Sequence, residues 1–434
     1  MRVWLPILLA AVAAFGLARS ANAQMGVTTT LPLNAAANPI VRVLLDHSLS
    51  NTNRLYISAS GPFTLKDALG NLVASGTSAS MFSVSWEAAS GPTVTPGLKA
   101  IDTAFGPQNS TDDSDEAPEI IKVDPVNPAD GVLLASTPTG KGCLYRGSIA
   151  VVALSSGLLR VVNSLHLEDY VRGVVRVEIG GSAPIEAMKA QAVAARTYAV
   201  RNIGRLWQEG ADIDDTTRCQ SYMGKNAECN NADLAVAQTS GQVLIYDGSV
   251  IDALYCTDCG GVTAVGPADE PYLSPVIDAE CALKPRWSYK ISRIQLNAML
   301  NQDASHGVGD LKRIEIDKTD ASGRAADIKL IGDVSERTIG GDAFRLLLGP
   351  DNLRSTLFKV KSDHDDDWVF SGQGWGHGLG MCQAGAIARA SGPNPETYTQ
   401  ILSDYYPGTQ LTLLTTVLVP SQPLITHIAT VSQR

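Results

Sequence analysis

Two segments of the chain combine residue types that could act on a sugar. The first covers residues 167–178 and ends at Glu178, directly before the turn that opens a helix. We therefore predict that Glu178 lies at a strand-to-helix junction, at the mouth of a cleft. The second covers residues 372–386, where five glycines within nine residues let a backbone approach a ligand closely. Trp375 and His377 would add a stacking surface and a polar tip for a sugar. The alternative for Glu178 is a solvated carboxylate, and the alternative for the glycine-rich segment is a tight turn.

The elements that must position these residues mix helices and strands. Ser182 as N-cap and Pro184 in the first turn predict a helix over residues 184–201, with one apolar stripe at intervals of three and four. The other expected elements are strands at 40–45, 145–147, 149–154, 158–162, 241–255 and 369–370, a hairpin of 311–316 with 326–330, and helices at 340–348 and 381–389. Because strands and helices do not alternate regularly, we predict an α+β fold of mixed, mostly antiparallel strands with a few helices.

The two ends and the overall charge bound the class of protein. Residues 1–23 have the order of a secretory signal, with Arg2, an apolar run and the small residues Ala21-Asn22-Ala23. We therefore expect an exported protein of the periplasm or cell envelope, without a membrane span after signal cleavage. The other predicted regions are a linker at 24–37, an acidic loop at about 105–118 and a C-terminal tail at 418–434. A net charge of −10 argues against nucleic acid as a partner.

Seven cysteines in an exported chain indicate disulfides. The candidates are Cys219, Cys229, Cys256, Cys259 and Cys281. A zinc site that uses Cys219, Cys229, Cys256 and Cys259 is the alternative, because Cys-x2-Cys is a common half-site. The oxidising compartment and the lack of His between residues 167 and 305 favour disulfides, so we expect no metal and no cofactor. A thiolate nucleophile at Cys382, five residues after His377, is a further alternative.

A series of motifs occurs in one order between residues 38 and 417. They are EDYVRGVV at 168–175, Glu178, EAMKAQAVAARTY at 186–198, CQSYMG at 219–224, GGVT at 260–263, WGHGLGM at 375–381 and YYPGT at 405–409. This series resembles the family of stage II sporulation protein D and the related amidase enhancers. The resemblance implies that residues 38–417 form a catalytic region of that type.

The resemblance implies a lytic transglycosylase that cleaves peptidoglycan glycan strands, preferably stripped of stem peptides. Glu178 would protonate the glycosidic oxygen at C1 of N-acetylmuramic acid, then take the proton of the 6-hydroxyl, which leaves a 1,6-anhydro end. No second carboxylate is required, unlike in ordinary glycosidases. The expected substrate-binding residues are Lys189, Arg196, Gln220, Tyr222, Trp375 and His377. Instead of contacting the glycan, Arg196 could orient Glu178 or pair with another carboxylate.

The main alternative function is not catalytic. The name amidase enhancer implies a protein that binds wall glycan and modulates a cell-wall amidase, with Glu178 as a binding residue. The resemblance also implies a disulfide between Cys259 and Cys281. Zinc-binding members would use His and Cys near the position of Cys219, but this chain has Thr216, Thr217 and Arg218 there. Ile179 and Cys382 also depart from the family pattern, which has Met and Ser at these places.

Overall fold

The computed structural model describes residues 38–49, 52–87, 91–96, 103–104, 120–137, 142–154, 156–282, 286–302, 305–362 and 367–416. These residues divide into two compact units. The flanking unit contains residues 38–252 and 410–416, and the inserted unit contains residues 253–409. The predicted signal peptide, linker, acidic loop and C-terminal tail lie outside the described residues. None of the helices in the described ranges is long and apolar enough to cross a membrane.

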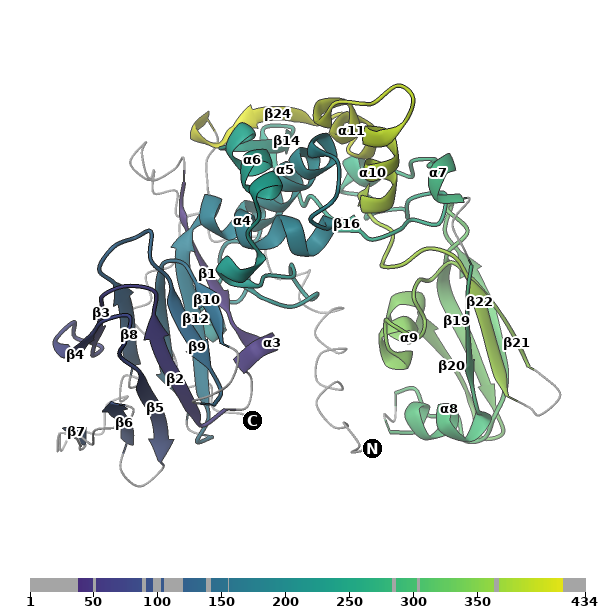
Figure 1. Cartoon of the computed structure of the whole chain (residues 1–434). Coiled ribbons are helices and arrows are strands. Elements are labelled where there is room, and N and C mark those ends of the chain that lie inside the picture. Colours follow the sequence, from purple (N-terminus) through teal and green to yellow (C-terminus); the bar gives the residue numbers. More distant parts are fainter. Residues whose placement is uncertain are drawn as a thin grey trace. The chain divides into compact units, whose positions relative to one another are not determined.

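Two sheets form most of the flanking unit (Figure 1). The seven-stranded sheet has the order β13 (Ile213–Asp214), β1 (Ile40–Leu44), β12 (Leu159–His166), β11 (Ser148–Ala153), β8 (Ile120–Pro125), β3 (Phe63–Lys66) and β4 (Leu72–Gly76). The six-stranded sheet has the order β10 (Cys143–Tyr145), β9 (Val132–Ala135), β2 (Arg54–Ala59), β5 (Phe82–Glu87), β6 (Gly91–Pro96) and β7 (Thr103–Ala104). Buried residues alternate with more exposed ones along β2 and β3, as in antiparallel strands with one face on a core.

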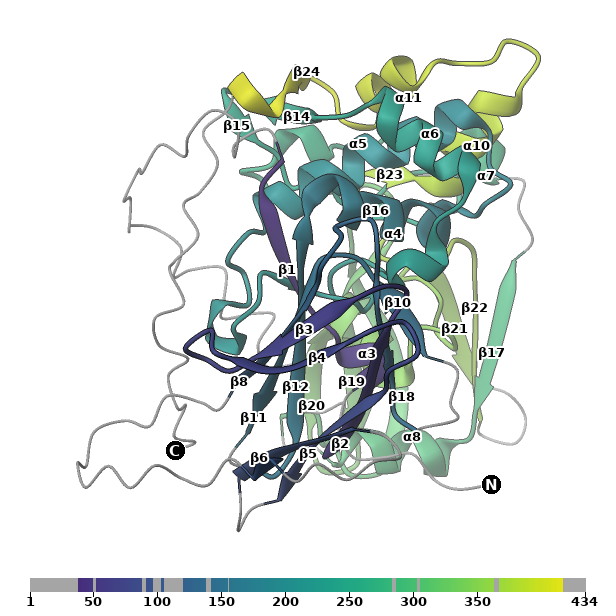
Figure 2. The ribbon, with the colours of Figure 1, turned by 60° about the vertical axis from the view of Figure 1, so that its left-hand side comes forward.

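Helices gather at one end of these sheets (Figure 2). The longest, α5 (Ile185–Arg201), packs against α4 (Leu167–Ile179) and α6 (Asn230–Gln238). Every residue of α5 from 190 to 200 is buried, so the predicted single apolar stripe is wrong: the alanines let neighbours approach from all sides. A small sheet of β15 (Ser249–Val250), β14 (Gln242–Tyr246) and β24 (Gln410–Leu413) completes the unit, with short helical turns α3 (Asp46–Leu49), η3 (Trp207–Glu209), η4 (Gly224–Ala227) and η6 (Leu414–Thr416).

The segment before α5 is helical, contrary to the prediction. Residues 167–179 form α4, so Glu178 lies in the last turn of a helix and the predicted strand-to-helix junction is wrong. The buried residues of α4 are Leu167, Tyr170, Val171, Gly173, Val174, Val175 and Ile179. Their spacing of three and four is helical, and burial of this face outweighs the strand preference of valine. Helix α5 is capped by Pro184, without a side-chain bond from Ser182.

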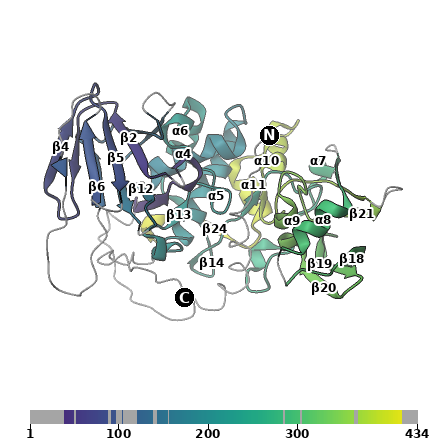
Figure 3. The ribbon, with the colours of Figure 1, turned by 90° about the horizontal axis from the view of Figure 1, so that it is seen from below.

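The inserted unit contains three smaller sheets, seen from below in Figure 3. They are β17 (Trp287–Ile291), β22 (Trp368–Gly372) and β21 (Phe358–Ser362); β18 (Leu311–Thr319), β19 (Ala325–Gly332) and β20 (Glu336–Gly340); and the parallel pair β16 (Tyr255–Cys256) and β23 (Met381–Cys382). The helices are η5 (Pro271–Leu273), α7 (Ala279–Ala282), α8 (Arg293–Leu300), α9 (Gly341–Leu348), α10 (Gln383–Ser391) and α11 (Tyr398–Tyr405). The predicted hairpin, the helix near 340–348 and the α+β class are confirmed.

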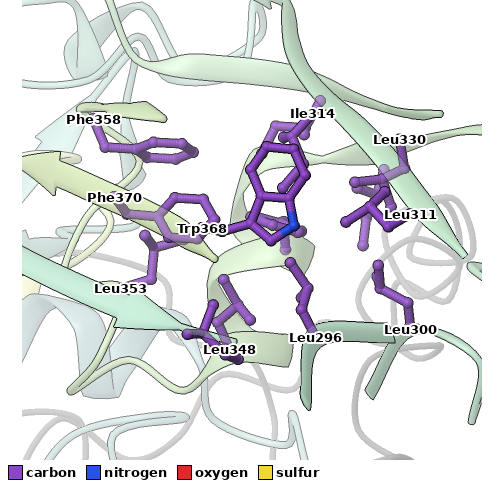
Figure 4. Packing of buried hydrophobic residues seen from close by; sticks show 14 of the residues in the cluster. Leu296, Leu300, Leu311, Ile314, Leu330, Leu348, Leu353, Phe358, Trp368 and Phe370 are labelled. Atoms are coloured by element: carbon purple, nitrogen blue, oxygen red, sulfur yellow. The ribbon is translucent and has the colours of Figure 1, made fainter. Parts of the chain in front are cut away.

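One hydrophobic core holds the inserted unit together (Figure 4). Phe370 of β22 packs against Phe344 of α9 and Phe358 of β21, with ring centroids 5.8 and 5.6 Å apart. Side chains of α8, β18 and β19 close this core around Trp368. Strand β22 is therefore firmly fixed where it leads into the glycine-rich segment at 372–380.

Candidate functional site

Glu178 is presented at the end of α4 with its carboxylate fixed by backbone. The side chain is partly exposed, and the N–H of Ser221 donates a hydrogen bond of 2.7 Å to its Oε1. Gly180 ends the helix with φ of 87°, a conformation that favours glycine, and its N–H donates to the carbonyl of Arg176. The carboxylate thus has a defined position next to the loop at 219–223.

Buried aromatic side chains anchor this loop. The ring of Tyr222 stacks on Tyr170 with centroids 5.2 Å apart, and its hydroxyl donates to Oδ1 of Asn163 at 2.8 Å. Gln220 accepts a hydrogen bond of 3.0 Å from the Tyr170 hydroxyl. Gln220 and Tyr222 are 1% and 3% exposed, so they are not placed to contact a glycan as predicted; they position Ser221.

Arg196 also serves the interior of the flanking unit. It is fully buried, and its Nε and Nη2 each donate to a carboxylate oxygen of Glu168 at 2.8 Å. Its guanidinium further donates to the carbonyl of Gln242. The predicted glycan contact is therefore wrong for Arg196, and pairing with another carboxylate is what the structure has. Lys189 is partly exposed, with Nζ 2.6 Å from Oε1 of Glu186.

Trp375 is more exposed than His377, the other candidate of the inserted unit. Its side chain is 39% exposed. Its backbone pairs with Asp258 in both directions, at 2.8 and 3.0 Å, and the guanidinium of Arg354 lies 4.5 Å from the ring centroid. An exposed indole held in this way offers a flat apolar face of the kind that binds a sugar ring.

His377 is held by backbone on both sides of its ring. Its Nδ1 accepts the N–H of Leu379 at 3.0 Å, and the ring also bonds to the backbone of Tyr255. Burial, followed by the positive charges of Arg345 and Arg324, lowers the pKa of His377 to about 4. The imidazole is therefore neutral at pH 7 and shapes the glycine-rich segment; a sugar contact by His377 stays a prediction.

The predicted disulfide cysteines are divided between the two units. Cys219 and Cys229 belong to the flanking unit, and Cys256, Cys259 and Cys281 to the inserted unit. All seven cysteines have free sulfur atoms in this structure. The Cys259–Cys281 disulfide that the resemblance implies therefore stays a prediction. Cys382 is fully buried, which does not suit a nucleophile for a glycan.

Cys219 does not belong to a group of side chains in the described residues that could hold a metal ion. Burial and the charge of Asp214 raise the pKa of the Cys219 thiol to about 11, so it stays protonated. In the described part of the chain, the group of metal-ligating side chains that lies close together contains Cys259, Cys281 and Cys382 with Asp258, and not Cys219.

Sequence comparisons identify the family. A family described as stage II sporulation protein matches residues 155–246, and a domain family of unknown function matches residues 278–380. Stage II sporulation protein D of Bacillus subtilis is 30% identical over 302 residues, which cover 64% of this chain and 84% of that protein. The chain therefore belongs to the stage II sporulation protein D family, as its motifs predicted.

Two other relatives extend the comparison. An uncharacterized protein of Brachyspira hyodysenteriae is 35% identical over 284 residues, which cover 63% of this chain and 73% of that protein. The amidase enhancer of Bacillus subtilis is 30% identical over 297 residues, which cover 56% of this chain but 40% of that protein.

Proposed function

We propose that this protein is a lytic transglycosylase that cleaves the glycan strands of peptidoglycan between N-acetylmuramic acid and N-acetylglucosamine. The observation that carries the proposal is the placement of Glu178, a partly exposed carboxylate in the last turn of α4 whose Oε1 is fixed by the Ser221 N–H. A catalytic acid must be both reachable and held in one position, and this group meets both requirements.

The proposed chemistry needs one carboxyl group that acts twice. Protonated Glu178 gives its proton to the glycosidic oxygen as the bond to C1 of N-acetylmuramic acid breaks. The resulting carboxylate then accepts the proton of the 6-hydroxyl of the same sugar as that oxygen bonds to C1. The product is a 1,6-anhydro end, no water is consumed, and Glu178 returns to its first protonation state.

The test is the substitution Glu178→Gln in the full chain. Gln keeps a side-chain oxygen for the Ser221 N–H but has no acidic proton, so we expect an unchanged fold and cleavage lower by about 10²–10⁴-fold. The measurement is mass spectrometry of fragments released from amidase-stripped glycan strands, with anhydro ends as the signature. Glu209→Gln, a partly exposed glutamate of the same unit paired with Arg218, is the matched control. Equal activity of wild type and Glu178→Gln would remove Glu178 from the mechanism.

A second candidate function is modulation of a cell-wall amidase by a protein that binds glycan without cleaving it. The observation that favours it is the relative named amidase enhancer, and the relatives' names support this function more directly than they support cleavage. The test adds the protein to an amidase acting on intact peptidoglycan and measures the release of stem peptides. Faster release with both wild type and Glu178→Gln, without anhydro fragments from either, would favour this second function.

Both functions require export to the cell envelope, where peptidoglycan lies. The predicted signal at residues 1–23 supports this compartment. Fractionation of cells, followed by N-terminal sequencing of the purified protein, tests it: we expect an envelope or periplasmic protein that begins near Gln24. A cytoplasmic protein that keeps residues 1–23 would contradict export.

A further inference from the structure

The inserted unit brings four cysteines from separate parts of the chain into one buried place. Cys256 ends β16, Cys259 follows three residues later, Cys281 lies on α7 and Cys382 ends β23. Their side chains are 4%, 0%, 1% and 0% exposed. We refer to Cys256, Cys259, Cys281 and Cys382 as the cysteine cluster. Four thiols so fully removed from solvent are well protected from outside reagents and chelators.

The distances within the cysteine cluster are those of a metal site. The sulfur atoms of Cys281 and Cys382 lie 3.3 Å apart. One donor atom each of Asp258, Cys259, Cys281 and Cys382 lies within 4.8 Å of all the others. Cys256 is the register partner of Cys382 in the parallel β16–β23 pair, and its thiol donates a hydrogen bond to that sulfur. Thiolates bound tetrahedrally to zinc at 2.3 Å lie about 3.8 Å from one another, a spacing within the range found here.

The sulfur of Cys382 accepts two backbone hydrogen bonds. The N–H groups of Cys259 and Gly385 donate to its sulfur at 3.2 and 3.4 Å. The second of these bonds is the N-cap of α10, where the helix dipole also favours a negative charge. Both bonds favour a negatively charged sulfur at this position, the form that binds metal.

Positive charge and a supporting carboxylate surround the cluster. Arg324 is 2% exposed and donates to the carbonyl of Cys259, and its charge and that of Arg345 act on Cys256. Two guanidinium groups can offset the net charge of −2 on a zinc ion with four thiolates. Asp278 lies 3.7 Å from the sulfur of Cys259 and accepts a hydrogen bond of 2.5 Å from Tyr405, an arrangement typical of the groups behind metal ligands.

We propose that the inserted unit binds a structural zinc ion through Cys259, Cys281 and Cys382, with Cys256 or Asp258 as the fourth ligand. Zinc fits because the site offers four donor atoms, at least three of them cysteine sulfurs. The cysteines are buried, as the ligands of closed structural zinc sites are. The ion would tie together β16, α7 and the start of α10. It would thereby fix the ends of the segment at 374–380, which carries Trp375. This inference rests on the cluster alone and does not depend on the proposed function.

The experiment is elemental analysis of the full chain, expressed with its own N-terminal residues and purified without chelator. We expect about one zinc ion per chain in the wild type, and less than about one fifth of that in Cys281→Ser and in Cys382→Ser. Cys143→Ser, a cysteine of the flanking unit, is the matched control and should keep its zinc. After replacement of zinc by Co²⁺, we expect the visible absorption of tetrahedral cobalt with thiolate ligands. Comparison of Cys256→Ser with Asp258→Asn in this spectrum identifies the fourth ligand.

The rival occupant of the same space is a pair of disulfides, and the test separates the two. Wild-type protein without zinc, in which peptide mapping finds Cys259 bonded to Cys281 and Cys256 to Cys382, would overturn the proposal. Zinc that stays bound in both Cys281→Ser and Cys382→Ser would also overturn it, because the ion would then lie elsewhere. The zinc content of the wild type decides the matter even if a serine variant fails to fold.

Discussion

Arg196 and Glu168 form an ion pair in the interior of the flanking unit. The Arg196 side chain is fully buried and that of Glu168 is 15% exposed. Arg196→Met would leave the Glu168 carboxylate desolvated without its cation, so we expect a loss of about 3–5 kcal/mol in the free energy of unfolding. Urea unfolding of the full chain measures it. Lys189→Met, which removes a partly exposed pair with Glu186, should cost less than about 1 kcal/mol.

The paired double variant sharpens this prediction. Glu168→Gln together with Arg196→Met removes both charges, so it should be more stable than Arg196→Met alone. A double variant that is less stable by the sum of both single losses would mean that the two residues act independently, contrary to the bidentate pair.

His377 gives the inserted unit a dependence on pH. Its pKa is about 4 in the folded protein and about 6.5 in an unfolded chain. The neutral ring therefore contributes stability that is fully present above pH 6.5 and is lost as the pH falls towards 4. The slope is at most about 1.4 kcal/mol per pH unit, and the partial exposure of the ring reduces it.

The measurement is the melting temperature of wild type and His377→Asn between pH 4 and pH 7. Asn keeps an acceptor for the Leu379 N–H but does not titrate, so its melting temperature should fall less steeply towards acid. Parallel pH profiles for the two proteins would show that another group carries the dependence.

Residue types alone could not reveal which candidates face a substrate. The sequence marked Glu178 and Arg196 from the same pair of motifs, yet one is partly exposed and the other has no exposed surface. The difference arises from Glu168, 28 positions before Arg196, which meets it only when α4 and α5 pack. Asn163 escaped notice for a similar reason, although a polar residue within an apolar strand such as β12 is a usable signal for a buried hydrogen bond.

Helix α4 depends on a glycine where it meets the loop at 219–223. A Cβ at Gly173 would lie 2.4 Å from the ring of Tyr222. In an open helix Gly→Ala stabilises by up to about 1 kcal/mol, but here the clash should reverse the sign and cost about 1–3 kcal/mol. A displaced Tyr222 would also shift Ser221, so the proposed cleavage should fall with stability in Gly173→Ala. Addition of Tyr222→Leu, which shortens the side chain, should restore part of the stability; no restoration would locate the strain elsewhere.

Helices and strands were predicted correctly where the spacing of apolar residues and the residue propensities agree. The prediction failed where these two signals favour different elements. The alanine-rich stretch at 185–201 and the hairpin of β18 and β19 were predicted because propensity and pattern agree there. In α4, by contrast, the four valines Val171, Val174, Val175 and Val177 suggested a strand. The acidic first turn, Glu168 and Asp169, was the signal that favoured a helix.

At the scale of the whole chain, one unit is inserted into the other. The chain leaves the flanking unit after residue 252 and returns at residue 410, where β24 pairs with β14. Motif order could not show this division, because the family motifs run through both units. A domain can be inserted into another when it has a hydrophobic core of its own. The inserted unit has such a core, which Figure 4 shows.

We therefore expect residues 253–409 to fold when expressed alone. The core around Phe370 lies entirely within this range, so the fragment should unfold in one cooperative transition, measured by circular dichroism with temperature. Leu348→Ala, at a position 2% exposed, should destabilise the fragment by about 2–5 kcal/mol, whereas Val334→Ala, at a position 79% exposed, should change it by less than about 0.5 kcal/mol. A fragment without a cooperative transition, or one equally affected by both variants, would mean that its core forms only with the flanking unit present.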